Sequence, residues 1–316
     1  MPHPRFCVEV GGAQEPGRER RFCVEGRELA PWHSDGADWQ LNQRERELAA
    51  SETKETVYCH TAEYVKLQKP PNLRRYPNVN LVRYNGVQCV LKTFGNLDTE
   101  NAMHEVNILR RLKHPNINAL IDIVFAKDQI HLILEYCKHG DLLVYVQEQK
   151  LKRQNISPEI ILLWMGQLLS AINHMHTLKI VHGDIKSQNV FVMDERRLCI
   201  GDMGSAQEAD ADGVCVLDRG TFIYSPPEIT QDDQPSSTKT DMWGIGCVFF
   251  EAMTQISIPD CRNRFTSLVE NNAVHSRMLK TQYSEILRRV VTLCLQADPH
   301  KRPSAQALMD MLAGSE

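Results

Sequence analysis

The residues best suited to chemistry lie in one stretch, His182–Asn189, and in a short motif further along the chain, Asp202–Gly204. Together they supply two carboxylates, Asp184 and Asp202, and the carboxamide of Asn189. Phosphoryl transfer needs such a set, because a divalent metal must neutralise the phosphate charge while a base orients the incoming hydroxyl. Either stretch taken alone also suits an ordinary loop capped by Asp and Asn, so the rest of the chain must decide between the two interpretations.

Length and composition restrict the class of protein. The chain has 316 residues, of which 42% are hydrophobic and 24% charged, as in an ordinary globular protein with one large core or two modest ones. The formal net charge of -4 gives no sign of a nucleic-acid footprint or of an anionic membrane surface. No stretch approaches the roughly 18 apolar residues of a membrane span. We therefore expect no nucleic-acid partner and no membrane partner.

The cysteines and the N-terminus indicate a compartment. The ten cysteines are spread singly, without a C-x-x-C pair or a cluster with histidine, so structural zinc is not expected. Residues 1–6 carry no apolar run that resembles a signal peptide. These observations favour a reducing compartment with free thiols. We expect an intracellular protein, cytoplasmic or nuclear.

Residues 1–56 differ in composition from the chain that follows, because they are rich in Arg, Glu and Gly. The pentapeptide Arg5–Glu9 recurs as Arg21–Glu25, either as a duplication, as a docking motif used twice, or by coincidence in a flexible tail. A charged helix over 38–50 has too few apolar positions to define a buried face. We expect this N-terminal extension to be disordered, and a docking partner for it stays open.

The remainder, 57–314, divides into a strand-rich part, 57–135, and a helical part, 140–314. Hydrophobic spacing, an Asn-Gly turn signal and a Ser-Pro helix start define the elements. Strands are predicted over 79–83, 87–91, 117–124 and 129–134, and helices over 100–112, 157–178, 240–253, 283–296 and 304–312. A small β-rich lobe followed by a larger helical lobe, an α+β fold, is therefore expected.

Residues from about 57 to 314 resemble a eukaryotic-type protein kinase domain of the serine/threonine branch, because many motifs occur in the family's order. The resemblance implies a bilobal α+β fold whose small β-rich N-lobe contains one helix. It also implies transfer of the ATP γ-phosphate to Ser or Thr hydroxyls of protein substrates, with Mg²⁺, or Mn²⁺ in its place. The run Lys186–Phe191 is similar to NIMA-related kinases, and Leu198–Asp202 is similar to kinases of herpes-type viruses.

The resemblance assigns nucleotide binding to eight residues of the domain. Lys92 would hold the α- and β-phosphates, and Glu105 would pair with that lysine. Leu134 matches the position that controls the depth behind the adenine pocket, and Val90 replaces a small alanine and narrows the pocket. The other residues implied to contact the nucleotide are Val79, Glu135, Cys137 and Phe191.

The resemblance assigns the transfer step to four residues. Asp184 would accept or orient the proton of the substrate hydroxyl, and Lys186 would contact the transferred phosphate. Asn189 and Asp202 would hold the metal. Lys186 is typical of the serine/threonine branch, as is the pair Gly220-Thr221.

Three further matches are expected to be structural. Glu228, in a segment similar to the family's A-P-E, would form a buried salt bridge with Arg302, and Asp241 would brace the catalytic loop. For substrate choice, Asp141 favours a basic residue upstream of the target, whereas Gln188 argues against one.

The chain departs from the family pattern at several places. The segment 72–79, where the family has a glycine-rich loop over the phosphates, contains no glycine. There, Arg74 and Arg75 either reach phosphate themselves or are solvated. Gly183 replaces an arginine that reads a phosphate on the activation loop, and 207–220 contains no Ser, Thr or Tyr. We expect activity without phosphorylation of that stretch; the alternative is a pseudokinase that acts as a protein-interaction scaffold.

Overall fold

The computed structural model describes residues 62–126, 129–215, 222–230, 235–259 and 272–314, with Phe265, Val269 and the short strands at 22–24, 27–29 and 56–59. The chain divides into two compact units, 1–51 and 52–316. In the first unit, β1 (Phe22–Val24) pairs antiparallel with β2 (Arg27–Leu29). The proposed helix over 38–50 and most of the pentapeptide repeat lie outside the described residues, so the predicted disorder stays a prediction.

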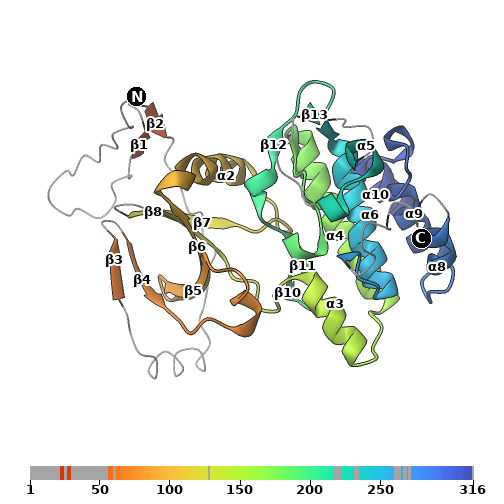
Figure 1. Ribbon diagram of the computed structural model, residues 1–316, viewed down its shortest axis with the longest axis horizontal. Coiled ribbons are helices and arrows are strands. Elements are labelled where there is room, and N and C mark those ends of the chain that lie inside the picture. The colour runs from red at the N-terminus through yellow and green to blue at the C-terminus, as the bar shows by residue number, and fades with distance from the viewer. Residues whose placement is uncertain are drawn as a thin grey trace. The chain divides into compact units, whose positions relative to one another are not determined.

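A six-stranded antiparallel sheet begins the second unit, with strand order β3-β4-β5-β6-β8-β7 (Figure 1). Its strands are β3 (Thr56–Cys59), β4 (Ala62–Lys66), β5 (Val79–Tyr84), β6 (Val87–Gly95), β7 (Leu120–Ala126) and β8 (Gln129–Glu135). The predicted hairpin is confirmed. Asn85 and Gly86 join β5 to β6 with φ values of 49° and 83°, the left-handed pair that a two-residue type I′ turn requires.

Strand register decides which side chains of β6 face the helix α2 (Thr99–Arg111), which connects to β7. Lys92 lies opposite Leu132 in the sheet, and Leu91 lies opposite Ile133. Opposed residues share a face, and neighbours along a strand alternate. Leu132 belongs with Val106 of α2 to the main core, whereas Leu91 and Ile133 belong to a smaller core on the other face. Lys92 therefore lies on the α2 face of the sheet.

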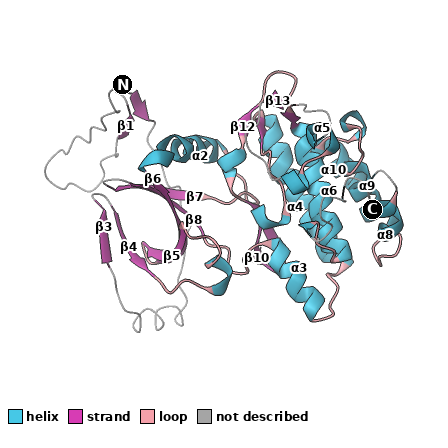
Figure 2. Ribbon diagram, viewed as in Figure 1, coloured by secondary structure: helices cyan, strands magenta, loops and turns pink. Residues whose placement is uncertain are grey.

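The part that follows the sheet is mainly helical (Figure 2). Its helices are α3 (Leu142–Leu151), α4 (Pro158–Thr177), α5 (Pro227–Thr230), α6 (Thr238–Thr254), α8 (Ala273–Met278), α9 (Glu285–Cys294) and α10 (Ala305–Ala313). The predicted helices are confirmed as α2, α4, α6, α9 and α10, with ends shifted by a few residues. α3 has no counterpart among the predicted helices. None of the described helices is long and apolar enough to cross a bilayer.

Short strand pairs and single 3₁₀ turns carry the loops of the helical part. The antiparallel pairs are β9 (Ile180–Val181) with β12 (Gln207–Glu208), β10 (Val190–Asp194) with β11 (Arg197–Ile200), and β13 (Val214–Cys215) with β14 (Ser236–Ser237). The 3₁₀ turns of this part include η3 (Ser187–Asn189) and η4 (Met203–Ser205), whereas η1 (Pro71–Leu73) lies in the loop between β4 and β5 of the sheet. The segment 182–189, which contains the candidate catalytic residues Asp184, Lys186 and Asn189, therefore connects β9 to β10.

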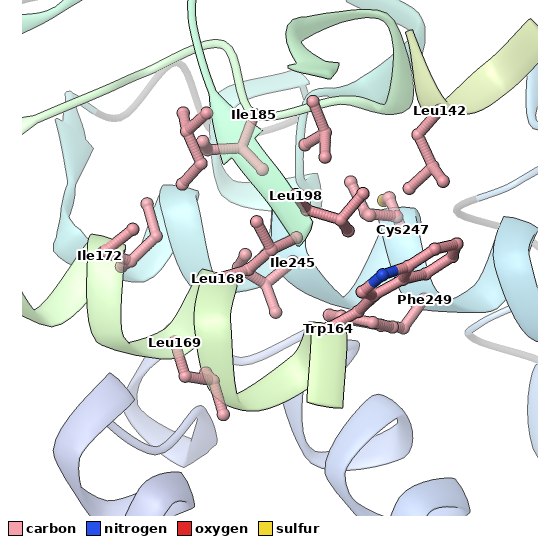
Figure 3. Packing of buried hydrophobic residues seen from close by; sticks show 14 of the residues in the cluster. Leu142, Trp164, Leu168, Leu169, Ile172, Ile185, Leu198, Ile245, Cys247 and Phe249 are labelled. Atoms are coloured by element: carbon pink, nitrogen blue, oxygen red, sulfur yellow. The ribbon is translucent and has the colours of Figure 1, made fainter. Parts of the chain in front are cut away.

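The core of the helical part forms between α4 and α6, where Trp164 and Leu168 pack with Ile245 and Phe249 (Figure 3). α6 is buried continuously from 241 to 253, as its apolar composition predicts. It also approaches the loop after β9 closely, because a Cβ added at Gly244 would lie 2.6 Å from the Cβ and the carbonyl oxygen of Ile185. This contact places the loop firmly against a rigid helix. The predicted α+β class, a β-rich lobe with one helix and a larger helical lobe, is confirmed.

Candidate active site

Three charged side chains from separate elements meet around Lys92. Its Nζ lies 2.9 and 2.7 Å from the two carboxylate oxygens of Glu105 on α2, and 2.8 Å from Oδ1 of Asp202. Burial opposes the charge on Lys92, but the two carboxylates outweigh it and raise the pKa of the ammonium. A lysine fixed in this way presents a compact positive charge, which suits an anionic ligand such as phosphate.

Asp202 lies in the left-handed region of backbone conformation, with φ 60° and ψ 75°. Asp tolerates that region better than most residues do, and such conformations concentrate at functional sites. Burial works against the Asp202 carboxylate, yet Lys92 outweighs it and lowers the pKa. Next to it, Met203 is fully buried.

A second cluster contains Asp184, Lys186 and Asn189. The Lys186 ammonium lies 2.6 Å from Oδ2 of Asp184. The side-chain nitrogen of Asn189 donates to the carbonyl of Asp184 at 2.8 Å and to its Oδ2 at 3.0 Å. Because both contacts use the amide nitrogen, the amide oxygen of Asn189 is kept as an acceptor for another group, such as a cation.

Asp241, on α6, braces the loop that carries this cluster, as predicted. Its carboxylate accepts hydrogen bonds from the backbone nitrogens of His182 at 2.9 Å and Gly183 at 2.8 Å, and from the ring of His176 at 2.8 Å. Gly183 has φ 74°, a conformation that glycine adopts at little cost. Asp241 is 1% exposed, so these three hydrogen bonds offset the free-energy cost of burying its carboxylate.

His182 is a positioning residue that sequence reasoning did not single out. Its ring is fully buried, Nδ1 accepts from the backbone nitrogen of Asp184 at 3.2 Å, and Nε2 donates to the carbonyl of Gly201 at 3.1 Å. The ring thereby joins the loop of Asp184 to the residue that precedes Asp202. The only signal in the sequence is its place at the start of the 182–189 motif.

Four predicted nucleotide contacts are half-buried apolar side chains. They are Val79, Val90, Leu134 and Phe191. Val90 lies opposite Leu134 in the sheet and two residues before Lys92, so all three share one face. Val79 lies opposite Lys92. A Cβ added at Gly201 would come within 2.6 Å of the Phe191 ring, so glycine is required behind it.

The other two predicted nucleotide contacts, Glu135 and Cys137, have side-chain partners inside the protein. The Glu135 carboxylate lies 3.1 and 3.3 Å from the guanidinium of Arg197. The Cys137 sulfur is buried and lies 3.6 Å from that of Cys199. A ligand at this point would therefore meet mainly the backbone of residues 135–137.

The glycine-free segment lies in the loop between β4 and β5 and is fastened by side chains. The Arg75 guanidinium forms an ion pair with Asp141, the N-cap of α3, which also accepts from the backbone nitrogen of Val144 at 3.1 Å. Lys69 donates to the carbonyl of Tyr76 at 2.5 Å. Arg75 thus has a carboxylate partner, which neither of the two expectations for it foresaw. Asp141 is 1% exposed, so the expectation that it receives a basic substrate residue is not supported.

Comparison with known proteins places this arrangement in a family. The protein kinase domain matches residues 86–312. The chain belongs to the protein kinase family. The predicted serine/threonine kinase family and the similarity to NIMA-related kinases are both confirmed.

The relatives found include three kinases from mouse and Dictyostelium discoideum. Mouse serine/threonine-protein kinase Nek3 is 33% identical over 217 residues, which cover 67% of this chain and 41% of the relative. Mouse serine/threonine-protein kinase Nek5 is 32% identical over 226 residues, 70% of this chain and 35% of the relative. A probable serine/threonine-protein kinase nek3 of Dictyostelium discoideum is 28% identical over 236 residues, which cover 72% of this chain and 21% of the relative. This chain spans less than half the length of these relatives.

The predicted salt bridge of the kinase domain is confirmed and buried. Arg302 donates to both carboxylate oxygens of Glu228, at 2.5 and 2.7 Å. Its remaining N–H groups donate to the carbonyls of Gln296, Lys239 and Ala297 at 2.7, 3.1 and 3.1 Å. All five donors of the guanidinium are therefore paired, as a buried charge requires.

The residues that would hold a metal in this kinase domain are Asn189 and Asp202. No group of three His, Cys, Asp or Glu side chains within the described residues could form a metal site by itself. Mg²⁺ bound together with a nucleotide needs only one or two carboxylates, because phosphates and water complete its oxygen shell. The half-exposed Asp202 carboxylate and the amide oxygen of Asn189 fit that requirement.

Proposed function

We propose that this kinase domain transfers the γ-phosphate of ATP to Ser or Thr hydroxyls of protein substrates. The observation that supports the proposal most is the contact of Lys92 with Glu105 and Asp202 at once. It joins the sheet, helix α2 and the segment after β11 in one charged cluster. A chain that served only as a scaffold would have little physical reason to hold a half-exposed carboxylate in a left-handed conformation beside that lysine.

Each side chain has a role in this proposal. Lys92 would neutralise the α- and β-phosphates, and the apolar faces of Val79, Val90, Leu134 and Phe191 would surround the adenine. Asp184 would orient the attacking hydroxyl, and Lys186 would contact the phosphate in transfer. Mg²⁺, or Mn²⁺ in its place, would be held by Asn189 and Asp202 and would supply neutralisation of the phosphate charge.

Substrates and location follow from the same proposal. Protein substrates are inferred from the names of the relatives, which are serine/threonine-protein kinases. Six cysteines, Cys89, Cys137, Cys199, Cys215, Cys247 and Cys294, are free and buried, in keeping with a reducing compartment, and we infer a cytoplasmic or nuclear location. A docking partner for the N-terminal tail stays a prediction.

A second candidate function is a pseudokinase scaffold, and one observation favours it. The loop over the expected phosphate site has no glycine, and the ion pair between Arg75 and Asp141 fastens it. Backbone N–H groups approach phosphate most easily where no Cβ intervenes. The two candidates differ in nucleotide binding and in phosphate transfer, so both can be measured.

The first experiment is thermal unfolding with and without Mg²⁺–ATP, on wild type, Lys92→Met and the control Lys280→Met, an exposed lysine far along the chain. At a hundredfold excess over Kd, ligand stabilises the folded state by about 2.7 kcal/mol. We expect a rise in Tm for wild type and the control, and none for Lys92→Met. An unchanged Tm for wild type with both Mg²⁺ and Mn²⁺ would favour the scaffold.

The second experiment measures incorporation of labelled phosphate into casein. Wild type is expected to transfer phosphate. If wild type binds ATP but transfers phosphate neither to casein nor to a library of Ser and Thr peptides, the scaffold function is favoured.

A further inference from the structure

Two contacts fasten helix α2 to the segment that follows Asp202. Nε2 of His104 lies 2.6 Å from the carbonyl oxygen of Ala206 and, because a carbonyl only accepts, the ring donates. The Arg111 guanidinium pairs with the carboxylate of Glu208 and donates to the carbonyl of Leu178 at 3.0 Å. α2 is thus held at two points along its length, by a hydrogen bond from His104 and by the ion pair of Arg111.

The segment held by α2 is also held from its other side. Gln207 and Glu208 form β12, which pairs with Val181 and Ile180 of β9. The backbone nitrogen of Ala209 donates to the carbonyl of Lys179 at 2.8 Å. β9 leads directly into the loop with Asp184, so segment 206–209 joins α2 to the start of that loop.

The location of these contacts ties them to Lys92. His104 precedes Glu105 in the sequence, and Arg111 follows it on the same helix by six residues, about 9 Å of axial rise. A shift of α2 away from segment 206–208 would break both contacts and draw the Glu105 carboxylate away from Lys92. The two contacts therefore restrain the position of the carboxylate that orients the lysine.

The chain lacks the parts that would make this restraint depend on phosphate. Residue 183 is glycine, which offers no side-chain cation, and 207–220 contains no Ser, Thr or Tyr to modify. Glu208 already provides an anion in that stretch, and Arg111 provides its cation. A carboxylate encoded in the sequence can form this contact without any modification of the chain.

We propose that His104 and Arg111 are positioning residues, which hold Glu105 against Lys92 through permanent contacts to segment 206–208. The catalytic arrangement then assembles without phosphorylation. This proposal rests on the proposed kinase function for its effect on rate, but the restraint on α2 is measurable in an inactive protein as well.

The test uses the full chain and compares kcat and KM for ATP with casein as the phosphate acceptor. Arg111→Glu is expected to lower kcat about threefold, because an exposed ion pair contributes modestly. The double variant Arg111→Glu/Glu208→Arg is expected to recover most of that loss. The matched control is Lys113→Glu, an exposed charge reversal just beyond α2, which should leave kcat unchanged.

The hydrogen bond is tested with two substitutions of one residue. His104→Phe, which has no donor, is expected to lower kcat about tenfold, and His104→Gln, which keeps one, is expected to restore it. Both variants should keep the wild-type Tm within a few degrees. If His104 had only a structural role, its substitution would lower Tm and would not act on kcat specifically. Phosphatase treatment should leave the wild-type rate unchanged.

Amide hydrogen exchange provides the measurement that does not need activity. His104→Phe and Arg111→Glu are expected to speed exchange in α2 more than Lys113→Glu does. Unchanged exchange and unchanged kcat in these variants would overturn the proposal, as would a wild-type rate lost on phosphatase treatment. A wild type that transfers no phosphate would overturn the proposed function alone, and the exchange rates of α2 would then decide this inference.

Discussion

Lys92 lies between two carboxylates, and both of them depend on its ammonium to remain charged. Removing the ammonium would leave Glu105, which is 1% exposed, as a buried acid without its cation. Asp202 would lose the group that keeps its pKa low. A single substitution at Lys92 therefore changes the electrostatics of the whole site.

The pH dependence of stability follows from the directions of two pKa shifts. The lowered pKa of Asp202 means that its contribution is present above the ordinary value of about 3.9 and is lost as pH falls through the depressed pKa. The raised pKa of Lys92 means that its contribution is present below about 10.4 and is lost as pH rises through the raised pKa. We expect Lys92→Met to lose both contributions. Because burial then raises the pKa of Glu105 further, the variant should also lose stability as pH rises above the ordinary Glu value.

Urea denaturation across the pH range, compared with the control Lys280→Met, measures this effect. Parallel pH profiles for wild type and Lys92→Met would show that the ion pairs around Lys92 do not couple to folding.

Asp184 is the second residue with a distinct prediction. Asp184→Asn keeps an oxygen that can accept from Lys186 and Asn189, so the fold should be retained within about 1 kcal/mol. Phosphate transfer should fall by about 10²- to 10⁴-fold, the usual contribution of a positioned base. The two measurements are incorporation of labelled phosphate and thermal unfolding. Normal transfer by this variant would remove Asp184 from the proposed role.

At the scale of elements, the carboxylate at the start of α3, Asp141, makes two separate contacts. Asp141 caps the helix through the Val144 nitrogen and also holds Arg75 of the β4–β5 loop. A helix start and a loop that lies far from it in sequence are therefore stabilised by the same side chain. This ion pair and the hydrogen bond from Lys69 to the carbonyl of Tyr76 together hold the glycine-free loop in position.

Substitutions at Asp141 can separate these two contacts. Asp141→Ala is expected to lower the free energy of unfolding by about 1–2 kcal/mol, because it removes the cap. Asp141→Asn should cost less, since its amide oxygen still accepts from Val144. Arg75→Ala removes the cation but leaves Asp141 as a buried carboxylate, so it measures the loss of the ion pair together with that burial cost. Urea denaturation of the three variants measures the order. Equal stability of the Ala and Asn variants would show that the cap contributes nothing.

At the scale of the whole molecule, a buried ion pair joins distant parts of the helical lobe. Glu228 belongs to α5, and Arg302 follows the turn Pro299–Lys301, which is 71 residues further along. The guanidinium also lies over the ring of Trp243 on α6, 5.0 Å from its centre. α5, α6 and the C-terminal segment therefore meet at one cation.

Breaking this pair should destabilise the lobe strongly. Arg302→Met is expected to lower the free energy of unfolding by about 3–5 kcal/mol, because Glu228 remains as an unpaired buried charge. The double variant Arg302→Met/Glu228→Leu should be less destabilised than Arg302→Met alone. Equilibrium urea unfolding tests both. A cost below about 1 kcal/mol for Arg302→Met would show that water reaches Glu228 in the variant.

Local patterns in the sequence were sufficient to predict most helices and strands and to identify the residues of the candidate site. The Asn85-Gly86 turn, the Ser157-Pro158 helix start and the apolar spacing of α4 each depend on neighbours a few residues away. For the same reason, the motif His182–Asn189 could be recognised without coordinates. α3 was missed because its apolar positions follow no clear helical stripe, although Asp141 at its start is a local N-cap.

Contacts between distant residues were decided only by the tertiary structure. Lys92 and Asp202 are 110 residues apart, and Arg111 and Glu208 are 97 apart. Which face of the sheet Lys92 occupies depends on the register between β6 and β8. The partner of Arg75 likewise depends on how the β4–β5 loop meets α3. A sequence names side chains that can form ion pairs, but packing brings one candidate partner close and excludes water and the others.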